Sequence, residues 1–154
     1  MWQGMRLNAK IVLSLCLLGS LFACRSGPRV ILNGGDKAIP VKVEIADTHA
    51  KRTLGLQYRQ DLAEDQGMLF LFAAERVQTF WMKNTPISLD LIFINARKTI
   101  VGIVHRAVPF STATLSVSSP SQFVLEIKGG VARQHHIKVG DTVRFEGIEL
   151  SPVE

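Results

Sequence analysis

Cysteine is nearly absent from the sequence, and the two that it has, Cys16 and Cys24, both lie in the first 24 residues. The remaining 130 residues therefore have no thiol with which to form a disulfide. A domain built from them must be stabilised by its core. Hydrophobic residues make up 47% of the chain, which is enough apolar material for one.

Motifs that mark well-known chemistries are also missing. The sequence has no glycine-rich phosphate loop, no Gly-x-Ser-x-Gly and no His-x-x-x-His. It also offers no cysteine nucleophile, because Cys24 is expected to carry lipid, for the reasons given below. His135 and His136 are adjacent, so their side chains point apart and make a poor metal site. No metal, no cofactor and no catalytic residue is predicted, which weakens the case for an enzyme and leaves that question open.

Long runs of one charge are absent as well. The formal net charge is +5, and Arg6 and Lys10 of the N-terminal segment account for two of these charges, leaving +3. No basic run remains, so a nucleic-acid partner is not predicted.

The only long apolar run in the first part of the chain, residues 11–22, has the order of an export signal. Arg6 and Lys10 precede it, it is too short for a comfortable membrane span, and Ala23 precedes Cys24. Residues 21–24 resemble a bacterial lipobox, although Phe22 stands where a smaller residue is usual; ordinary cleavage or an uncleaved anchor are the alternatives. We therefore expect an exported protein whose Cys24 carries lipid, anchored to a bacterial membrane and facing the periplasm or exterior.

The expected organisation is a signal peptide over residues 1–23, a polar tether over 24–38 and one domain over 39–150. From Cys24 onward about 131 residues remain, which fits one compact domain. Alternating or continuous apolar runs predict a mainly β fold, a compact sandwich or barrel-like domain with one or two short helices and a single core. The strands are expected at residues 39–46, 66–72, 77–82, 89–94, 99–104, 122–128 and 142–146, and short helical turns at 49–56 and 131–136.

The stretch over residues 80–90 concentrates polar and aromatic side chains between two apolar runs. As a strand it places Trp81 and Lys83 on one face, and Pro86 then ends the strand. The bend should bring Asp90 back toward Lys83, and we expect this strand to lie beside 66–72. The serine- and threonine-rich loop at 110–120 could cover the domain as a lid or wrap its rim.

These features predict a site at which an indole stacks on a ligand and a lysine holds an anionic or hydroxylated group. The candidate ligand-binding residues are Arg52, Trp81, Lys83, Asn84, Asp90 and His105. The competing interpretation is that Trp81 fills the core and that Lys83 with Asp90 only pins a loop.

Three function classes follow from this. The favoured one is a module that binds a small ligand or glycan. The second is a structural or interaction protein of the cell envelope, and the third is an enzyme that uses Asp90 with His105 or Lys83 as acid and base. The sequence gives no indication of the oligomeric state.

Several segments resemble the family catalogued as domain of unknown function 192. They are residues 67–70, 80–85, 89–94, 124–126 and 140–141, together with Arg52, Gly55, Leu56 and Arg59. Two positions depart from the pattern, because Gln57 stands where methionine is common and Ser88 where proline is usual. The resemblance implies a mainly β sandwich or barrel with a short helix, exported or membrane-tethered in many members, and no established activity.

Overall fold

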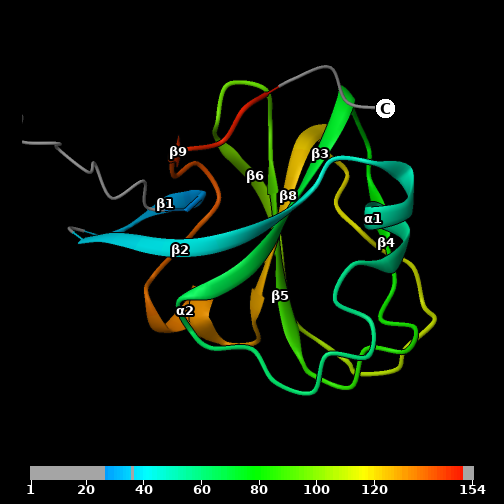
Figure 1. The fold of residues 1–154 in the computed structure, drawn as a ribbon. Helices are drawn as coiled ribbons and strands as arrows, with labels where there is room; N and C mark the ends of the chain where they lie inside the picture. Colours follow the sequence, from blue (N-terminus) through cyan, green and yellow to red (C-terminus); the bar gives the residue numbers. More distant parts are fainter. Residues whose placement is uncertain (1–26, 36, 151–154) are drawn as a thin grey trace, which may run out of the picture.

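A computed structural model describes residues 27–35 and 37–150 of the chain (Figure 1). The predicted signal peptide and Cys24 lie outside the described residues. The elements in chain order are β1 (Arg29–Gly34), β2 (Lys37–Ala46), α1 (His49–Leu54), β3 (Gln66–Arg76), β4 (Thr79–Phe80), β5 (Leu89–Ile94), β6 (Ile100–Ala107), β7 (Leu115–Ser116), β8 (Ser121–Lys128), α2 (Val131–Gln134) and β9 (Val143–Glu146).

One curled, seven-stranded sheet with the order β6-β5-β8-β3-β2-β1-β9 forms the body of the protein. All its pairings are antiparallel except that of β2 with β3. The mainly β fold with two short helices is therefore confirmed, in the form of a half-barrel. Within the described ranges, no helix is both long and apolar enough to span a bilayer.

The sheet has apolar side chains on both faces, and this corrects the expectation of a single core. Leu69, Ile92 and Leu125 stand in register on three neighbouring strands and belong to one cluster. Phe70 and Phe93, one residue further along their strands, belong to a second cluster. Successive side chains of a strand point to opposite faces, so a sheet covered on both sides has two apolar layers.

The two layers are covered by different parts of the chain. In Figure 1, α1 and β4 lie on one side of the central strands, and α2, β1 and β9 lie on the other. Val131 and Ala132 of α2 pack into the first cluster, and Leu56, just after α1, packs into the second.

The sheet begins earlier than the sequence indicated. Residues 29–34, which we expected to belong to the tether, form β1 between β2 and β9. Val30 and Leu32 are fully buried there. The polar and glycine residues around this three-residue apolar run concealed a strand that gains its stability from pairing with both neighbours.

The predicted strand at 77–82 is reduced to the two residues of β4, and its expected position beside β3 was wrong. β4 pairs with β7, which lies inside the serine- and threonine-rich loop. β3 instead pairs with β2 and β8. The predicted hairpin of 89–94 with 99–104 is confirmed by the antiparallel pair of β5 and β6.

The short helix α1 lies within the helical turn expected at 49–56 and is capped at both ends. The Thr48 side chain accepts a hydrogen bond from the Lys51 backbone N–H, and Gly55 follows the last turn with a φ of 50°. No residue of α1 is buried, so its position depends on its caps and on a few polar contacts.

Candidate functional site

A cavity of about 540 Å³ opens between α1, the aromatic end of β3 and the β4 region, and we call it the α1 pocket. Its apolar walls include Phe70, Phe72, Phe80 and Trp81, with Leu54 and Leu56 on the α1 side. Its polar lining comprises His49, Arg52, Thr53, Gln57, Thr79, Thr85, Thr114 and Glu126. Ligand sites commonly have this size and combine apolar, aromatic walls with polar groups.

Phe80 fixes the wall of the pocket that β4 provides. Its ring makes edge-to-face contacts with Phe70 at 5.1 Å, Phe93 at 6.0 Å and Phe72 at 6.3 Å between centroids. Met82, two residues on, is buried, and its backbone N–H donates to the Ser111 carbonyl. The inward side chains of Phe80 and Met82 leave the one between them, Trp81, facing outward.

Trp81 lines the pocket and is 55% exposed. The interpretation in which it fills the core is therefore wrong. Leu54 of α1 also lines the pocket and is equally exposed at 55%. The rim of the α1 pocket thus presents two large apolar side chains to solvent.

Glu126 lies in the α1 pocket and comes from β8, a central strand of the sheet. The residue is only 4% exposed, and its register partners on the flanking strands are Met68 and Leu91. Among the described residues, no group donates a hydrogen bond to its carboxyl. Burial raises the pKa of Glu126 from the usual 4.5 to about 8, because a carboxylate is poorly solvated in such surroundings.

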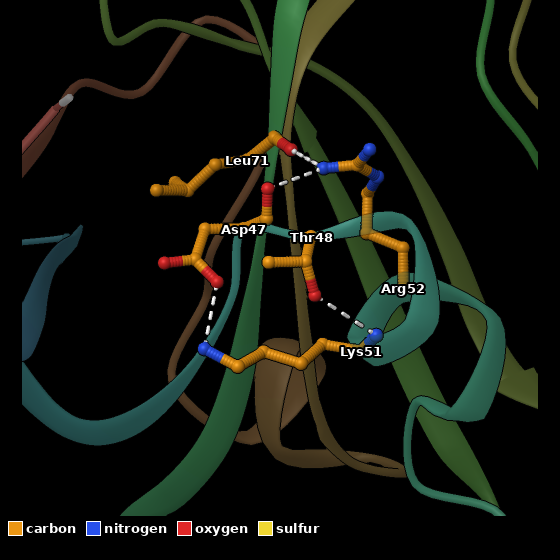
Figure 2. A network of polar contacts seen from close by, with 5 residues as sticks. All are labelled: Asp47, Thr48, Lys51, Arg52 and Leu71. Atoms are coloured by element: carbon orange, nitrogen blue, oxygen red, sulfur yellow. Dashed lines mark hydrogen bonds and ion pairs between the residues drawn. The ribbon is translucent and has the colours of Figure 1, made fainter. Parts of the chain in front are cut away.

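Arg52 is the cation of the pocket lining, and contacts with two carbonyl groups and an aromatic ring hold its side chain in place (Figure 2). Its Nη1 donates to the carbonyl of Asp47 at 2.8 Å and to that of Leu71 at 3.0 Å. Its guanidinium carbon also lies 5.5 Å from the centroid of the Phe72 ring. Arg52 therefore ties α1 to the end of β3 and holds a positive charge at that side of the pocket.

The close-up of this network shows how the N-terminal part of α1 is held (Figure 2). Lys51 Nζ lies 2.7 Å from a carboxylate oxygen of Asp47, and the Lys51 backbone N–H donates to Thr48 Oγ1. The side-chain hydrogen bond from Lys51 lowers the pKa of Asp47, and solvent weakens this exposed pair.

Of the six predicted site residues, Arg52 and Trp81 line the α1 pocket, and the other four do not. Lys83 is exposed, and the Lys83–Asp90 pair we expected is absent from the ion pairs between described residues. Asn84 has a φ of 55° and donates from Nδ2 to Gln57 Oε1 and to the Tyr58 hydroxyl. Asn84 therefore links the β4–β5 connection to the segment after α1.

Asp90 is completely buried and acts as a structural anchor. One oxygen accepts from the Arg106 backbone N–H at 2.7 Å, and the other accepts from those of Gly130 and Ala132, both at 2.9 Å. The alternation along β5 directs Asp90 away from the face that carries the α1 pocket. A carboxylate occupied by three backbone donors and closed to solvent has no access to a substrate.

The glycine pair beside Asp90 makes this anchor possible. A Cβ at Gly129 would lie 2.5 Å from Ser88 Oγ, and Gly130 has a φ of 102°. Only glycine allows both the close approach and this backbone conformation at no steric cost. The turn after β8 therefore delivers the backbone amides of Gly130 and Ala132 to Asp90.

His105 lies on β6, an edge strand of the sheet, and is half-buried. Its Nδ1 is buried and has no hydrogen-bond partner among the described residues. Within the described ranges, no three His, Cys, Asp or Glu side chains are grouped so that they could hold a metal ion.

Sequence reasoning missed Glu126, because the strand expected at 122–128 was identified by the alternation of Phe123, Leu125 and Ile127, which concerns the other face. The signal that could have identified it is Val124, which is apolar on the same face as Glu126. A strand that is apolar on both faces lies in the middle of a covered sheet, and a carboxylate within it is buried.

Comparison with known proteins gives a family and a fold. Residues 30–145 match the profile of the family described as "Uncharacterized ACR", domain of unknown function 192. A protein of unknown function from Novosphingobium aromaticivorans DSM 12444 has a similar crystal structure, with 37% identity and a TM-score of 0.73 over 75% of this chain and 83% of that chain. A protein described as a "putative transcription regulator" from Sinorhizobium meliloti 1021 shows 35% identity and a TM-score of 0.75 over 80% of this chain and 97% of that chain. No curated protein matches the chain.

Proposed function

The chain belongs to the family of domain of unknown function 192, and we propose that its function is to bind a small molecule in the α1 pocket. The observation that carries this proposal is a cavity of about 540 Å³ with phenylalanine walls and a buried carboxyl, Glu126, that no described residue pairs. The binding module expected from the sequence is thus kept, with its site moved from Lys83 and Asp90 to Glu126 and the aromatic walls.

Two features support ligand binding over a purely structural role. A carboxyl without a hydrogen-bond partner in an apolar environment destabilises the fold, whether it keeps its proton or ionises, whereas an apolar side chain at position 126 would not. Ionisable groups whose pKa is strongly shifted by burial in a cleft are frequent at binding and catalytic sites. Glu126 meets this description within the described part of the chain.

Trp81 provides a direct test of binding, because it lies on the pocket wall and is more than half exposed. The other tryptophan, Trp2, is replaced by phenylalanine so that emission reports Trp81 alone. We expect a red-shifted, acrylamide-quenchable emission that changes on titration with a pocket ligand. A library of small molecules, including envelope saccharides and peptidoglycan fragments, is screened in parallel for an increase in melting temperature.

The matched pair of variants is Trp81→Ala and Phe110→Ala. Phe110 is 64% exposed and does not line the α1 pocket, so it controls for loss of an exposed aromatic side chain. Calorimetry should show weaker binding of any hit to Trp81→Ala and unchanged binding to Phe110→Ala. A hit that binds both variants equally, or a library without any hit, contradicts the proposal.

A second candidate function is docking of a partner protein at the same rim. It is favoured by the exposure of Leu54 and Trp81, because exposed apolar side chains that gather in a patch are typical of interaction surfaces. A protein of this kind would respond to no small molecule in the screen, and its partner contact would still be lost in Trp81→Ala.

We also propose that the domain works at the surface of a bacterial membrane, held there by lipid on Cys24. Only residues 25–28 separate Cys24 from β1, and an extended chain of that length spans roughly 15 Å. Wild-type protein should remain in membranes after an alkaline carbonate wash, and Cys24→Ser should be released. Full retention of Cys24→Ser would contradict lipid anchoring.

A further inference from the structure

We propose that the ligand of the α1 pocket is an organic amine, which directs its ammonium group to Glu126 and its apolar body to the phenylalanine walls. This inference rests on the proposed function, since it names the chemical class that the same pocket binds. It starts from Glu126, which lines the cavity from a central strand and is the only acidic residue among the described residues of the lining.

The state of the empty pocket defines what a ligand must supply. Glu126 stands between Met68 and Leu91 in the sheet and receives no hydrogen bond from a described residue. Its raised pKa means that the carboxyl holds a proton over most of the neutral range. An ammonium brings the positive charge and N–H donors that the carboxylate lacks. When an ammonium binds, the Glu126 proton leaves to solvent and one N⁺–H···O⁻ pair forms in its place.

The walls favour a cation over an anion or a sugar. Phe70, Phe72, Phe80 and Trp81 line the pocket, and the face of an aromatic ring attracts a cation. An anion placed there would face both the rings and the Glu126 carboxyl. A glycan has many hydroxyl groups to satisfy, and the walls on the β3 and β4 side are mainly aromatic.

The other charged or titratable groups of the pocket lining are His49 and Arg52, both from α1. Arg52 is fixed by the carbonyls of Asp47 and Leu71 (Figure 2), so its charge stays at the α1 side. It repels a second cation there. The ammonium must therefore lie near Glu126, which leaves the α1 side to the apolar body of the ligand.

Three probes with a common aromatic body test the class: 2-phenylethylamine, 2-phenylethanol and 3-phenylpropanoate. Calorimetry on the full-length protein at pH 7 should show the amine binding about tenfold or more tightly than the alcohol, with the carboxylate weakest. In Glu126→Gln, the amine should lose this advantage while the alcohol binds as before.

Proton release supplies a second measurement that needs no variant. Titrations in buffers of different ionisation enthalpy should show release of close to one proton per amine bound at pH 7, and none for the alcohol. The affinity for the amine should rise by up to about tenfold for each pH unit between pH 6 and 8.

The possible results separate this inference from the proposed function. If the alcohol or the carboxylate binds as tightly as the amine, or the amine binds without proton release, the amine class is wrong and the pocket remains a binding site. If none of the three probes binds, the inference is also overturned. The proposed function fails with it only when the wider library gives no hit that depends on Trp81.

Discussion

Glu126 should make the protein less stable as pH rises through the neutral range, and this effect can be isolated with one isosteric substitution. Burial raises its pKa in the folded state from 4.5 to about 8. Below pH 4.5 the carboxyl is protonated in both the folded and the unfolded chain. Between pH 4.5 and 8 the folded state keeps a proton that the unfolded state has lost, so stability falls as pH rises. Above about pH 8 the carboxyl is ionised in both states, and stability falls no further on its account.

The expected size of the effect follows from the shift. A difference of one unit between the folded and unfolded pKa corresponds to about 1.36 kcal/mol of unfolding free energy. The rise from 4.5 to about 8 therefore corresponds to roughly 5 kcal/mol, of which about 3 kcal/mol is lost between pH 5 and pH 7.5. That is a large part of the 5–15 kcal/mol by which native domains are usually stable. Glutamine at position 126 has nearly the same shape and does not titrate.

The measurement is urea unfolding of wild type and Glu126→Gln at half-unit steps from pH 5 to 8, followed by circular dichroism. The other titratable groups are the same in both proteins, so their contributions cancel in the difference between the two unfolding free energies. We expect that difference to change by about 3 kcal/mol in favour of Glu126→Gln between pH 5 and 7.5. A difference that stays constant within about 0.5 kcal/mol would show that Glu126 is not held in an unpaired, desolvated state.

Three further substitutions test the architecture that surrounds the pocket. Asp90→Asn replaces one acceptor oxygen with an N–H₂ group that meets a backbone donor, so it should lower the unfolding free energy by about 2–4 kcal/mol in urea unfolding. The control is Asp61→Asn at an exposed position, which should change stability by less than about 0.5 kcal/mol. Equal values for the two variants would show that Asp90 is not an anchor. Leu125→Ala should lower the unfolding free energy by about 2–5 kcal/mol, because Leu125 is fully buried between Leu69 and Ile92. Lys128→Ala on the same strand is the control and should change stability little. A loss below about 0.5 kcal/mol for Leu125→Ala would place Leu125 outside the core. Thr48→Ala removes the N-cap of α1 and should lower the unfolding free energy by about 1 kcal/mol, which a lower melting temperature would report. Thr53→Ala within the helix is its control. Identical melting temperatures would mean that the cap contributes nothing to stability.

The sequence allowed the strands with clear periodicity to be predicted, and they include the ones that build the sheet. The strand expected at 122–128 is β8, and the helical turn expected at 49–56 contains α1, which begins after its cap Thr48. The family resemblance was also confirmed. These successes rest on local signals, namely side-chain period, caps and short motifs, which do not depend on the rest of the fold.

The errors arise where the position of a segment depends on distant partners. β1 is stabilised by β2 and β9, which lie on opposite sides of it and come from opposite ends of the described chain. Asp90 was expected near Lys83 because the two are close in sequence, yet it is satisfied by amides 16 to 42 residues away. Glu126 was not identified because a period of two cannot distinguish a solvent face from a second apolar layer.

The two faces of the sheet differ in how they are closed, and this explains why the candidate site lies where it does. On one face, α2 packs Val131 and Ala132 into the core, and Asp90 fastens the start of that helix to β5 and β6. On the other face, α1 contributes no buried residue and β4 is only two residues long, so the covering elements leave a cavity. Glu126 lines that cavity from β8 and two phenylalanines line it from β3, and both strands are paired on both sides, whereas α1 is held by its caps and by the contacts of Arg52. A carboxyl on a strand that is paired on both sides is held in position before a ligand arrives, and this supports the proposal that the cavity binds a small molecule.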